Sequence, residues 1–327
     1  MRRCDFIVGM ASSSLAWPLA LRAQQSDKPV IGFIGLAPFA PMQDYLAGFR
    51  LGLKGEGFVE GENVVVEYRS AENQLDRLPA IAAEVVRQRV AVIVTVGGDP
   101  SIVAAKSATT AIPIIFNTGT DPVRAGHVAS MNSPGGNATG VNLFTGELGP
   151  KRLSLLSDLL PTASHLAILF NPNVPLGVIN ADQAETAARN LGKQVKKYTA
   201  SSNEEIDAAF AAIAQDRVNA LLVAAEPTFN ARRDRIVALA ARYSLPTMYE
   251  QREFAVAGGL ISYGTSLVET YRLQGLYAGK ILKGANVSDL PVIQLSKFEL
   301  VINLRTAKAL GLTIPSGLLS IVDDVIE

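Results

Sequence analysis

The chain has 327 residues, of which 48% are hydrophobic and 18% are charged, and its 30 basic residues balance its 30 acidic ones. This length accommodates two lobes of ordinary domain size, and the apolar fraction is too high for a disordered chain. The charge balance disfavours a nucleic-acid binder, and one Cys with two His residues excludes a disulfide framework and a Cys/His zinc cluster.

The first 23 residues have the pattern of a secretory signal peptide. Arg2-Arg3 provides a positive start, and the apolar run Phe6–Leu21 is shorter than the ~20 residues of a spanning helix. We expect cleavage between Ala23 and Gln24. The paired arginines resemble a twin-arginine signal with one extra residue before the apolar run, so both this route and the general secretory route stay open. The mature protein is therefore expected to be soluble and periplasmic.

From Pro29 onward, short apolar runs alternate with amphipathic helical stretches, which predicts parallel sheets with helices on both faces. In the first half we predict strands at Val30–Gly35, Val64–Tyr68, Ala91–Val96, Pro113–Phe116 and Thr139–Leu143, and helices at Gln43–Lys54, Leu75–Gln88 and Pro100–Ala108. In the second half we predict strands at Leu166–Phe170, Gln194–Thr199, Ala220–Val223, Thr247–Tyr249 and Leu260–Ser262, and helices at Leu148–Leu160, Ala181–Leu191, Asn203–Gln215, Asn230–Tyr243 and Leu267–Leu282.

The two halves of the chain also resemble each other in sequence. Arg89–Val94 parallels Arg217–Leu222, and Ile112–Phe116 parallels Leu245–Tyr249 in the same order. Two ordered matches with similar offsets predict two related α/β lobes. The loops that follow the strands then line a single cleft, and closure of the lobes about a hinge is a known way to enclose a ligand.

Several catalytic motifs are absent from the sequence. No G-x-G-x-x-G follows the first strand, and neither G-x-x-x-x-G-K-[ST] nor G-x-S-x-G occurs. We therefore expect neither a nucleotide enzyme nor an α/β-hydrolase, and predict no catalytic residue, no cofactor and no metal. We interpret His165 as a structural residue, whereas His127 has no evident partner in the sequence.

The loop Asn117–Val123 follows a strand and is the most informative candidate site. Thr118, Gly119, Thr120 and Asp121 bring together hydroxyls, a Gly and an acid before a Pro that can start a helix. Amides and hydroxyls at a helix start can bind a ligand carboxylate, and Asp121 can hold an ammonium group. Asp121 can equally act as a helix cap, and the sequence leaves these alternatives open.

Two acids occupy matching positions in the two halves. Asp99, which follows Gly98, and Glu226 each end the third strand of a half and precede a Pro. Each can cap the next helix or take the positive end of a zwitterion, and the matched positions favour capping for both. Further candidates lie at or after strand ends, where rings can form the walls of a ligand pocket and an Asn can supply an amide: Phe39, Asn171, Phe229, Tyr249 and Tyr263. Core packing is an equally good interpretation of each ring.

Six segments form an ordered set that covers essentially the whole chain after the signal: Ala23–Gln25, Asp121–Val123, Pro134–Val141, Arg232–Val237, Ala257–Gly264 and Lys297–Leu304. This set resembles the tryptophan/tyrosine-type substrate-binding proteins of ABC transporters. The resemblance implies a type I periplasmic-binding fold with two Rossmann-like lobes. It also implies three crossovers, which we place near Phe144–Gly149, Gly264–Ser266 and Ile293–Ser296.

In this arrangement, residues 24–144 and 267–293 make the first lobe, and residues 145–266 and 294–327 make the second. Helix Leu267–Leu282 then packs on the first lobe, and the tail from Lys297 packs on the second. The chain departs from the family at Gly97–Pro100, where relatives often carry Gly-Thr and small residues. The added acid there alters the charge of the pocket, so an aromatic amino acid is not assumed to be the ligand.

Our leading hypothesis is a solute-binding protein of an ABC importer that captures a small ligand, an aromatic or other amino acid, between two closing lobes without turnover. Its expected partners are that ligand and a membrane permease, with no nucleic acid, and we expect a monomer. The alternative is a periplasmic sensor that presents a bound solute to a membrane receptor. A hydrolase or isomerase is a weaker third hypothesis. A neighbouring permease gene favours transport, and a neighbouring sensor-kinase gene favours sensing.

Overall fold

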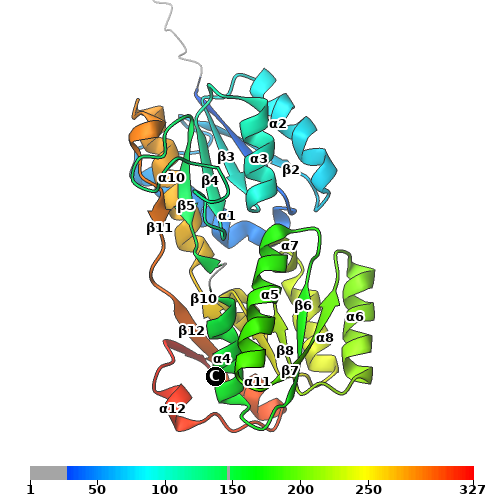
Figure 1. Cartoon of the computed structure of the whole chain (residues 1–327). Coiled ribbons are helices and arrows are strands. Elements are labelled where there is room, and N and C mark those ends of the chain that lie inside the picture. Colours follow the sequence, from blue (N-terminus) through cyan, green and yellow to red (C-terminus); the bar gives the residue numbers. More distant parts are fainter. Residues whose placement is uncertain (1–27, 146–147) are drawn as a thin grey trace, which may run out of the picture.

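The computed structural model describes residues 28–145 and 148–327, so the expected signal peptide of residues 1–23 lies outside the described residues. The described residues form two α/β lobes, each built on one sheet flanked by helices (Figure 1). None of the helices in these two ranges has both the length and the hydropathy that crossing a membrane requires.

The sheet of the first lobe consists of parallel strands. Their order is β11 (Ile293–Gln294), β5 (Ala138–Asn142), β4 (Ile114–Thr118), β3 (Val92–Val96), β1 (Val30–Gly35) and β2 (Val65–Ser70). The helices of this lobe are α1 (Gln43–Gly55), α2 (Leu78–Arg87), α3 (Asp99–Ala108) and α10 (Leu267–Leu282). Ile31 and Phe33 of β1 pack with α1 and α10, whereas Ile34 packs with α2 and α3. Helices therefore cover both faces, because successive strand residues point to opposite sides.

The sheet of the second lobe is mixed. Its order is β13 (Asp324–Ile326), β12 (Glu299–Asn303), β10 (Ile261–Gly264), β9 (Thr247–Tyr249), β8 (Ala220–Val223), β6 (His165–Phe170) and β7 (Gln194–Thr199). Only the pair of β10 and β12 is antiparallel among these described strands. The helices are α4 (Gly149–Leu159), α5 (Pro175–Asn190), α6 (Asn203–Gln215), α7 (Pro227–Asn230), α8 (Arg233–Arg242), α9 (Arg252–Val256), α11 (Leu304–Ala309) and α12 (Ser316–Leu319).

The chain passes from one sheet to the other after β5, after β10 and after β11. Between these passages, α10 returns to the first lobe and packs along α1 (Figure 1). The predicted fold class, two α/β lobes with largely parallel sheets and three crossovers, is confirmed. The crossovers bring the loops that follow the strands of both lobes toward one region between them.

The predicted strands are all present, and their ends agree with the structure to within two residues. The helices differ more. α5 begins at Pro175 rather than Ala181, because a Pro at the first helical position lacks only an N–H that the first turn does not need. The predicted helix Asn230–Tyr243 corresponds to α8, which begins at Arg233, and the short helix α7 that ends at Asn230 was not predicted. The short elements α9, α11 and α12 and strands β11 to β13 were not predicted as elements.

Candidate functional site

A cavity of about 60 Å³ lies between the lobes, at the ends of their strands, and we call it the central cavity. The first lobe, with α10, contributes Leu36, Ala37, Met42, Tyr45, Val96, Gly97, Gly98, Asn117, Thr118, Gly119, Leu143, Leu267 and Tyr271. The second lobe and its connection contribute Thr145, Leu176, Glu226, Pro227, Asn230 and Glu250. Its wall is largely apolar with a few polar groups, as in most small-molecule sites.

Glycines bring the two lobes into close approach around this cavity. A Cβ atom at Gly119 would lie 2.7 Å from Leu176 Cδ2 and 2.2 Å from Thr145 Oγ1, so a side chain there would displace these groups of the facing lobe and its connection. Gly97 and Gly98 have φ angles of +101° and +77°, which non-glycine residues rarely adopt. Gly119 and Gly98 of the first lobe therefore lie directly against side chains of the second lobe and its connection, Thr145, Leu176 and Pro227.

Glu226 lines the central cavity and is only 1% exposed. Its Oε2 accepts the N–H of Thr228 at 2.8 Å and thereby caps α7, which confirms capping for this residue. Asn171 holds the same Thr228 from the other side, since its Nδ2 donates to Thr228 Oγ1 at 3.1 Å. Burial raises the pKa of Glu226 to about 7, against the opposing effect of the Thr228 hydrogen bonds.

Glu250 is a second carboxylate of the central cavity and is 6% exposed. Burial raises its pKa, and the positive charge of Arg152 opposes this rise. The Arg152 guanidinium is itself fully buried, and it donates to Tyr263 O at 2.7 Å and to Asn180 Oδ1 at 3.2 Å. Glu250 therefore has a cation nearby that does not line the cavity, whereas Glu226 is held mainly by neutral groups.

Two tyrosines from different helices form an aromatic wall of the central cavity. Tyr45 of α1 and Tyr271 of α10 have ring centroids 5.4 Å apart and are 2% and 4% exposed. Burial raises the pKa of both phenols, so they remain neutral at physiological pH. This wall suits the apolar or aromatic body of a ligand.

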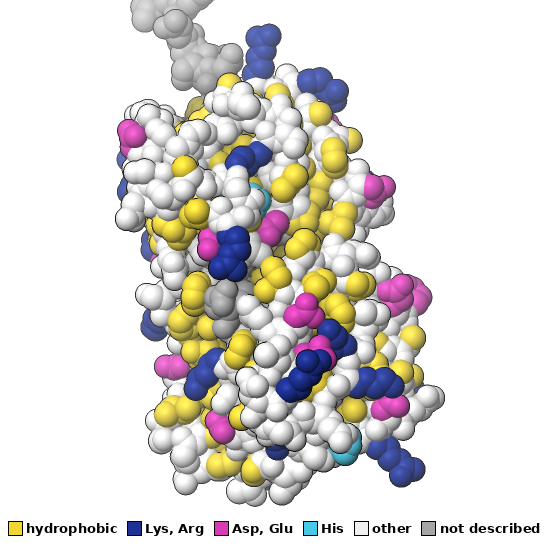
Figure 2. Space-filling model, viewed as in Figure 1, with side chains coloured by type: hydrophobic (Ala, Val, Ile, Leu, Met, Phe, Trp, Pro, Cys, Tyr) yellow, Lys and Arg dark blue, Asp and Glu magenta, His cyan; other side chains and the backbone are white. Residues whose placement is uncertain are grey.

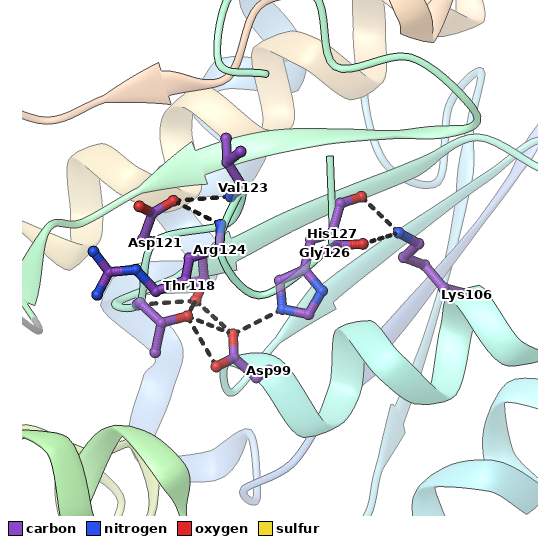
Figure 3. A network of polar contacts seen from close by, with 9 residues as sticks. Asp99, Lys106, Thr118, Asp121, Val123, Arg124, Gly126 and His127 are labelled. Atoms are coloured by element: carbon purple, nitrogen blue, oxygen red, sulfur yellow. Dashed lines mark hydrogen bonds and ion pairs between the residues drawn. The ribbon is translucent and has the colours of Figure 1, made fainter. Parts of the chain in front are cut away.

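Asp99 stands at the centre of a polar network next to the central cavity (Figure 3). Its Oδ1 accepts from Thr118 Oγ1 at 2.7 Å and lies 3.0 Å from His127 Nε2, and Thr120 Oγ1 donates to the same carboxylate at 2.9 Å. Burial pushes the pKa of Asp99 upward, but hydrogen bonds from His127 and the two threonines outweigh burial and lower the pKa overall. The predicted capping is wrong for Asp99, because these side chains take up its carboxylate.

Asp121 is exposed and does not line the central cavity. Its Oδ1 accepts the N–H groups of Val123 at 2.9 Å and Arg124 at 3.1 Å, and the segment it caps is a turn rather than the expected helix (Figure 3). Asp99, Thr120 and Asp121 line a second cavity of about 590 Å³, which we call the side cavity. Of the two alternatives for Asp121, a cap or a ligand for an ammonium group, its hydrogen bonds correspond to a cap.

The structure brings four of the predicted site residues to the central cavity: Gly98, Thr118, Gly119 and Glu226. The predicted rings do not line it. Phe39 packs against Phe33 and Tyr68, Phe229 and Tyr249 lie in the core of the second lobe, and Tyr263 packs against Phe298. All four rings instead pack in or against the hydrophobic core, which was the other interpretation of these residues.

Sequence reasoning missed several cavity residues. Tyr45 and Tyr271 lie within helices, where the sequence pattern predicts that a buried aromatic residue belongs to the core. Their place in the cavity wall depends on how α1 packs against α10. Glu250 could have been predicted from the sequence. It directly follows β9, and Glu226 likewise comes shortly after β8. His127, which had no partner in the sequence, pairs with Asp99.

Two broader features limit what the site can do. On the face shown in Figure 2, basic and acidic side chains are interspersed without a continuous patch of one sign. Among residues 28–145 and 148–327, no three or more His, Cys, Asp or Glu side chains gather as a metal site would require. The arrangement favours enclosure of a small molecule by two lobes.

Comparison with known proteins gives one family and several relatives. The family described as ABC transporter substrate binding protein matches residues 40–326. A protein of Clostridioides difficile named tyrosine-binding protein is 27% identical over 282 residues, which cover 86% of this chain and 81% of the relative.

Two solved structures share the fold of this chain. A conserved domain protein from Vibrio cholerae has a TM-score of 0.83 at 24% identity, with 91% of this chain and 99% of that chain covered. An ABC domain in complex with L-Trp from Streptococcus pneumonia has a TM-score of 0.81 at 23% identity, with 91% and 100% covered. Both likenesses extend over the two lobes.

Proposed function

This chain belongs to the family of ABC transporter substrate-binding proteins, and from that premise we propose that it captures a small amine-bearing ligand for the permease of an ABC importer. The ligand binds in the central cavity, and the lobes close over it and open to release it. Binding involves no turnover, and the protein acts as a monomer. Gly98, Thr118, Gly119 and Glu226 contact the ligand, together with Tyr45, Tyr271 and Glu250.

The single observation that carries this proposal is the buried carboxylate of Glu226 in the cavity wall. Ionisation of a carboxyl group away from water is unfavourable unless a cation pairs with it. The raised pKa of Glu226 reflects this cost. A protonated amine placed against Glu226 supplies the missing positive charge, and the pair is then worth more than it would be at the surface.

The opposite wall supports an apolar body on that ligand. Tyr45 and Tyr271 offer ring faces, and Met42 and Leu267 add aliphatic contacts. The names of the relatives agree with such a molecule, since one is called a tyrosine-binding protein and one structure contains L-Trp. Aromatic amino acids and the corresponding amines are therefore the first molecules to test.

Export to the periplasm belongs to the same proposal. It rests on the expected signal peptide of residues 1–23, with its Arg pair, its short apolar run and its small residues before Gln24. Intact mass measured on protein recovered from the periplasm of a Gram-negative host tests it. A mature chain beginning at Gln24 is expected, and retention of residues 1–23 in the cytoplasm would contradict it.

Thermal unfolding against a panel of amino acids, amines and small carboxylates tests ligand capture. A ligand at 100 times its Kd adds ~2.7 kcal/mol to the free energy of unfolding, which corresponds to a rise in Tm of several degrees. We expect a selective rise with amine-bearing molecules that is lost in Glu226→Gln. Asp158→Asn is the matched control, because Asp158 is exposed near the end of α4. A protein that responds only to molecules without an amine would refute the proposed role of Glu226.

A further inference from the structure

We propose that the central cavity prefers a net-cationic amine, with a protonated amino group and no carboxylate, over the amino acid of the same side chain. This inference rests on the proposed function and narrows the class of ligand. It follows from three features of the site: the charges that line the cavity, the hydroxyl groups beside it, and the position of Asp99.

The charged side chains that line the central cavity are both acidic. Glu226 and Glu250 line it, and no Lys, Arg or His does so within the described part of the chain. Arg152, whose positive charge acts on Glu250, does not line the cavity and donates instead to Tyr263 O and Asn180 Oδ1. A zwitterionic amino acid would bring its own carboxylate into this acidic setting without a basic side chain to meet it.

The two threonine hydroxyls at the end of β4 and in the loop after it are already engaged by Asp99. Thr118 ends β4 and Thr120 lies in the loop after it, and each directs its hydroxyl to Asp99. Thr118 Oγ1 also accepts the N–H of Thr120 at 3.1 Å, so that backbone amide is used as well. These donors are therefore bound to groups of the protein itself, chiefly the Asp99 carboxylate.

Asp99 also occupies a helix start, next to the central cavity, that would otherwise favour a ligand anion. It is the first residue of α3, and the N-terminus of a helix favours negative charge. The hydrogen bonds from Thr118, Thr120 and His127 keep this carboxylate ionised. A ligand carboxylate brought to this end of α3 meets a fixed like charge, which raises the free energy of the bound amino acid.

The repulsion between the two carboxylates depends on the medium around them. Two like charges close together repel more strongly inside a protein, where the effective dielectric constant is about 20, than in water, where it is about 80. A ligand without the carboxylate avoids this cost and keeps its ion pair with Glu226. The amine is therefore expected to bind more tightly than the amino acid.

Isothermal titration calorimetry with matched pairs tests the inference: tryptamine with L-Trp, and tyramine with L-Tyr, on the purified protein at pH 7.5. We expect each amine to bind about tenfold or more tightly than its amino acid. In Asp99→Asn, which keeps the size of the side chain and removes its charge, the gap within each pair should shrink. Asp158→Asn, which removes an exposed charge remote from the cavity, should leave the gap unchanged.

The outcomes separate this inference from the proposed function. Tighter binding of the amines, with a smaller gap in Asp99→Asn, supports it. Tighter binding of the amino acids overturns it and leaves capture of an amine-bearing ligand intact. An unchanged gap in a folded Asp99→Asn protein overturns the role of Asp99, and binding of neither member of any pair overturns the inference and counts against the proposed function as well.

Discussion

Glu226 is held in place by hydrogen bonds at the start of α7, and its burial makes ionisation of the carboxyl group unfavourable. Its carboxylate accepts from Thr228, and Asn171 in turn holds Thr228, so the side chain is fixed before any ligand arrives. Such fixed placement lowers the entropy that ligand binding must overcome. The same burial that fixes Glu226 raises its pKa to about 7, which couples ligand binding to protonation near neutral pH.

The affinity for an amine should therefore depend on pH. Tryptamine stays protonated below about pH 9, so the change in affinity comes from the protein. Glu226 must be ionised to pair with the amine, so the affinity should rise as pH increases to about 7 and level off above it. Calorimetry between pH 5.5 and 8.5 measures this. Glu226→Gln should remove most of the rise, and a steady loss of affinity from pH 5.5 to 7 in the native protein would contradict the assignment.

The free energy of unfolding of the protein without ligand should fall as pH rises, whereas the affinity for an amine should rise. The folded-state pKa of Glu226 lies above its ordinary value of 4.5, so the folded state binds more protons than the unfolded state between pH 4.5 and 7. This group therefore destabilises the fold as pH rises through that window, by up to about 3 kcal/mol. Glu226→Gln should raise Tm at pH 8 and change it little at pH 4.5. An equal change at both pH values would point to lost hydrogen bonds instead.

The sequence predicted some of the individual residues of the central cavity correctly, but the aromatic residues that it predicted there do not line it. Glu226, Thr118 and Gly119 were found because they end or follow strands, and strand ends in a parallel sheet converge on one edge. Phe229 and Tyr249 also follow or end strands, yet they point into the second-lobe core. The direction of a side chain at a strand end depends on tertiary packing, which no local pattern reveals.

Glycines set the spacing between the two helices that carry the tyrosines. A Cβ atom at Gly275 of α10 would lie 2.0 Å from Phe49 O of α1, and one at Gly52 would lie 1.8 Å from Arg272 O. The two helix backbones are therefore in direct contact, and this contact holds Tyr45 beside Tyr271. The aromatic wall of the cavity is a consequence of this close packing.

Gly275→Ala should consequently destabilise the fold. The added methyl group has no space without separation of α1 from α10, and overpacking of this kind costs about 1–3 kcal/mol. Urea unfolding measures the change. Gly55→Ala is the control at the end of α1, where an added Cβ meets nothing within 4 Å and helix propensity favours Ala. Equal stability of the Gly275→Ala and native proteins would show that the helix pair can relax.

The elements themselves were predicted well where their pattern was long and regular. Strands such as β7 and β8 and helices such as α6 and α10 match in both bounds, because apolar runs and amphipathic periods continue through them. The predicted helix Ala181–Leu191 begins too late, because Pro175 is the first residue of α5. β12 was missed because it pairs antiparallel with β10, outside the alternating βα pattern.

At the scale of the whole molecule, the two lobes meet through loops around the central cavity. Gly119 of the first lobe packs against Leu176 of the second, and Gly98 faces Pro227 at longer range. Closure of two lobes requires that such contacts form without a clash. A ligand that contacts residues of both lobes shifts the molecule toward this closed arrangement, because it gains those contacts only there.

Gly119→Ala should therefore weaken ligand binding by blocking closure. Its Cβ would lie within 2.7 Å of both Thr145 Oγ1 and Leu176 Cδ2. We expect about tenfold weaker binding and a radius of gyration that no longer decreases when ligand is added, as measured by calorimetry and small-angle X-ray scattering. Gly317→Ala in α12, where a Cβ has open space, is the control. Unchanged affinity and unchanged compaction in Gly119→Ala would show that closure does not depend on this contact.

The crystal structure of the protein with the tightest-binding ligand from the matched pairs is the most direct test of the central claim. The account predicts that the ligand lies in the central cavity with its nitrogen within hydrogen-bond distance of the Glu226 carboxylate. The ring of the ligand should contact Tyr45 and Tyr271. A ligand bound in the side cavity, or one whose nitrogen faces away from Glu226, would contradict it.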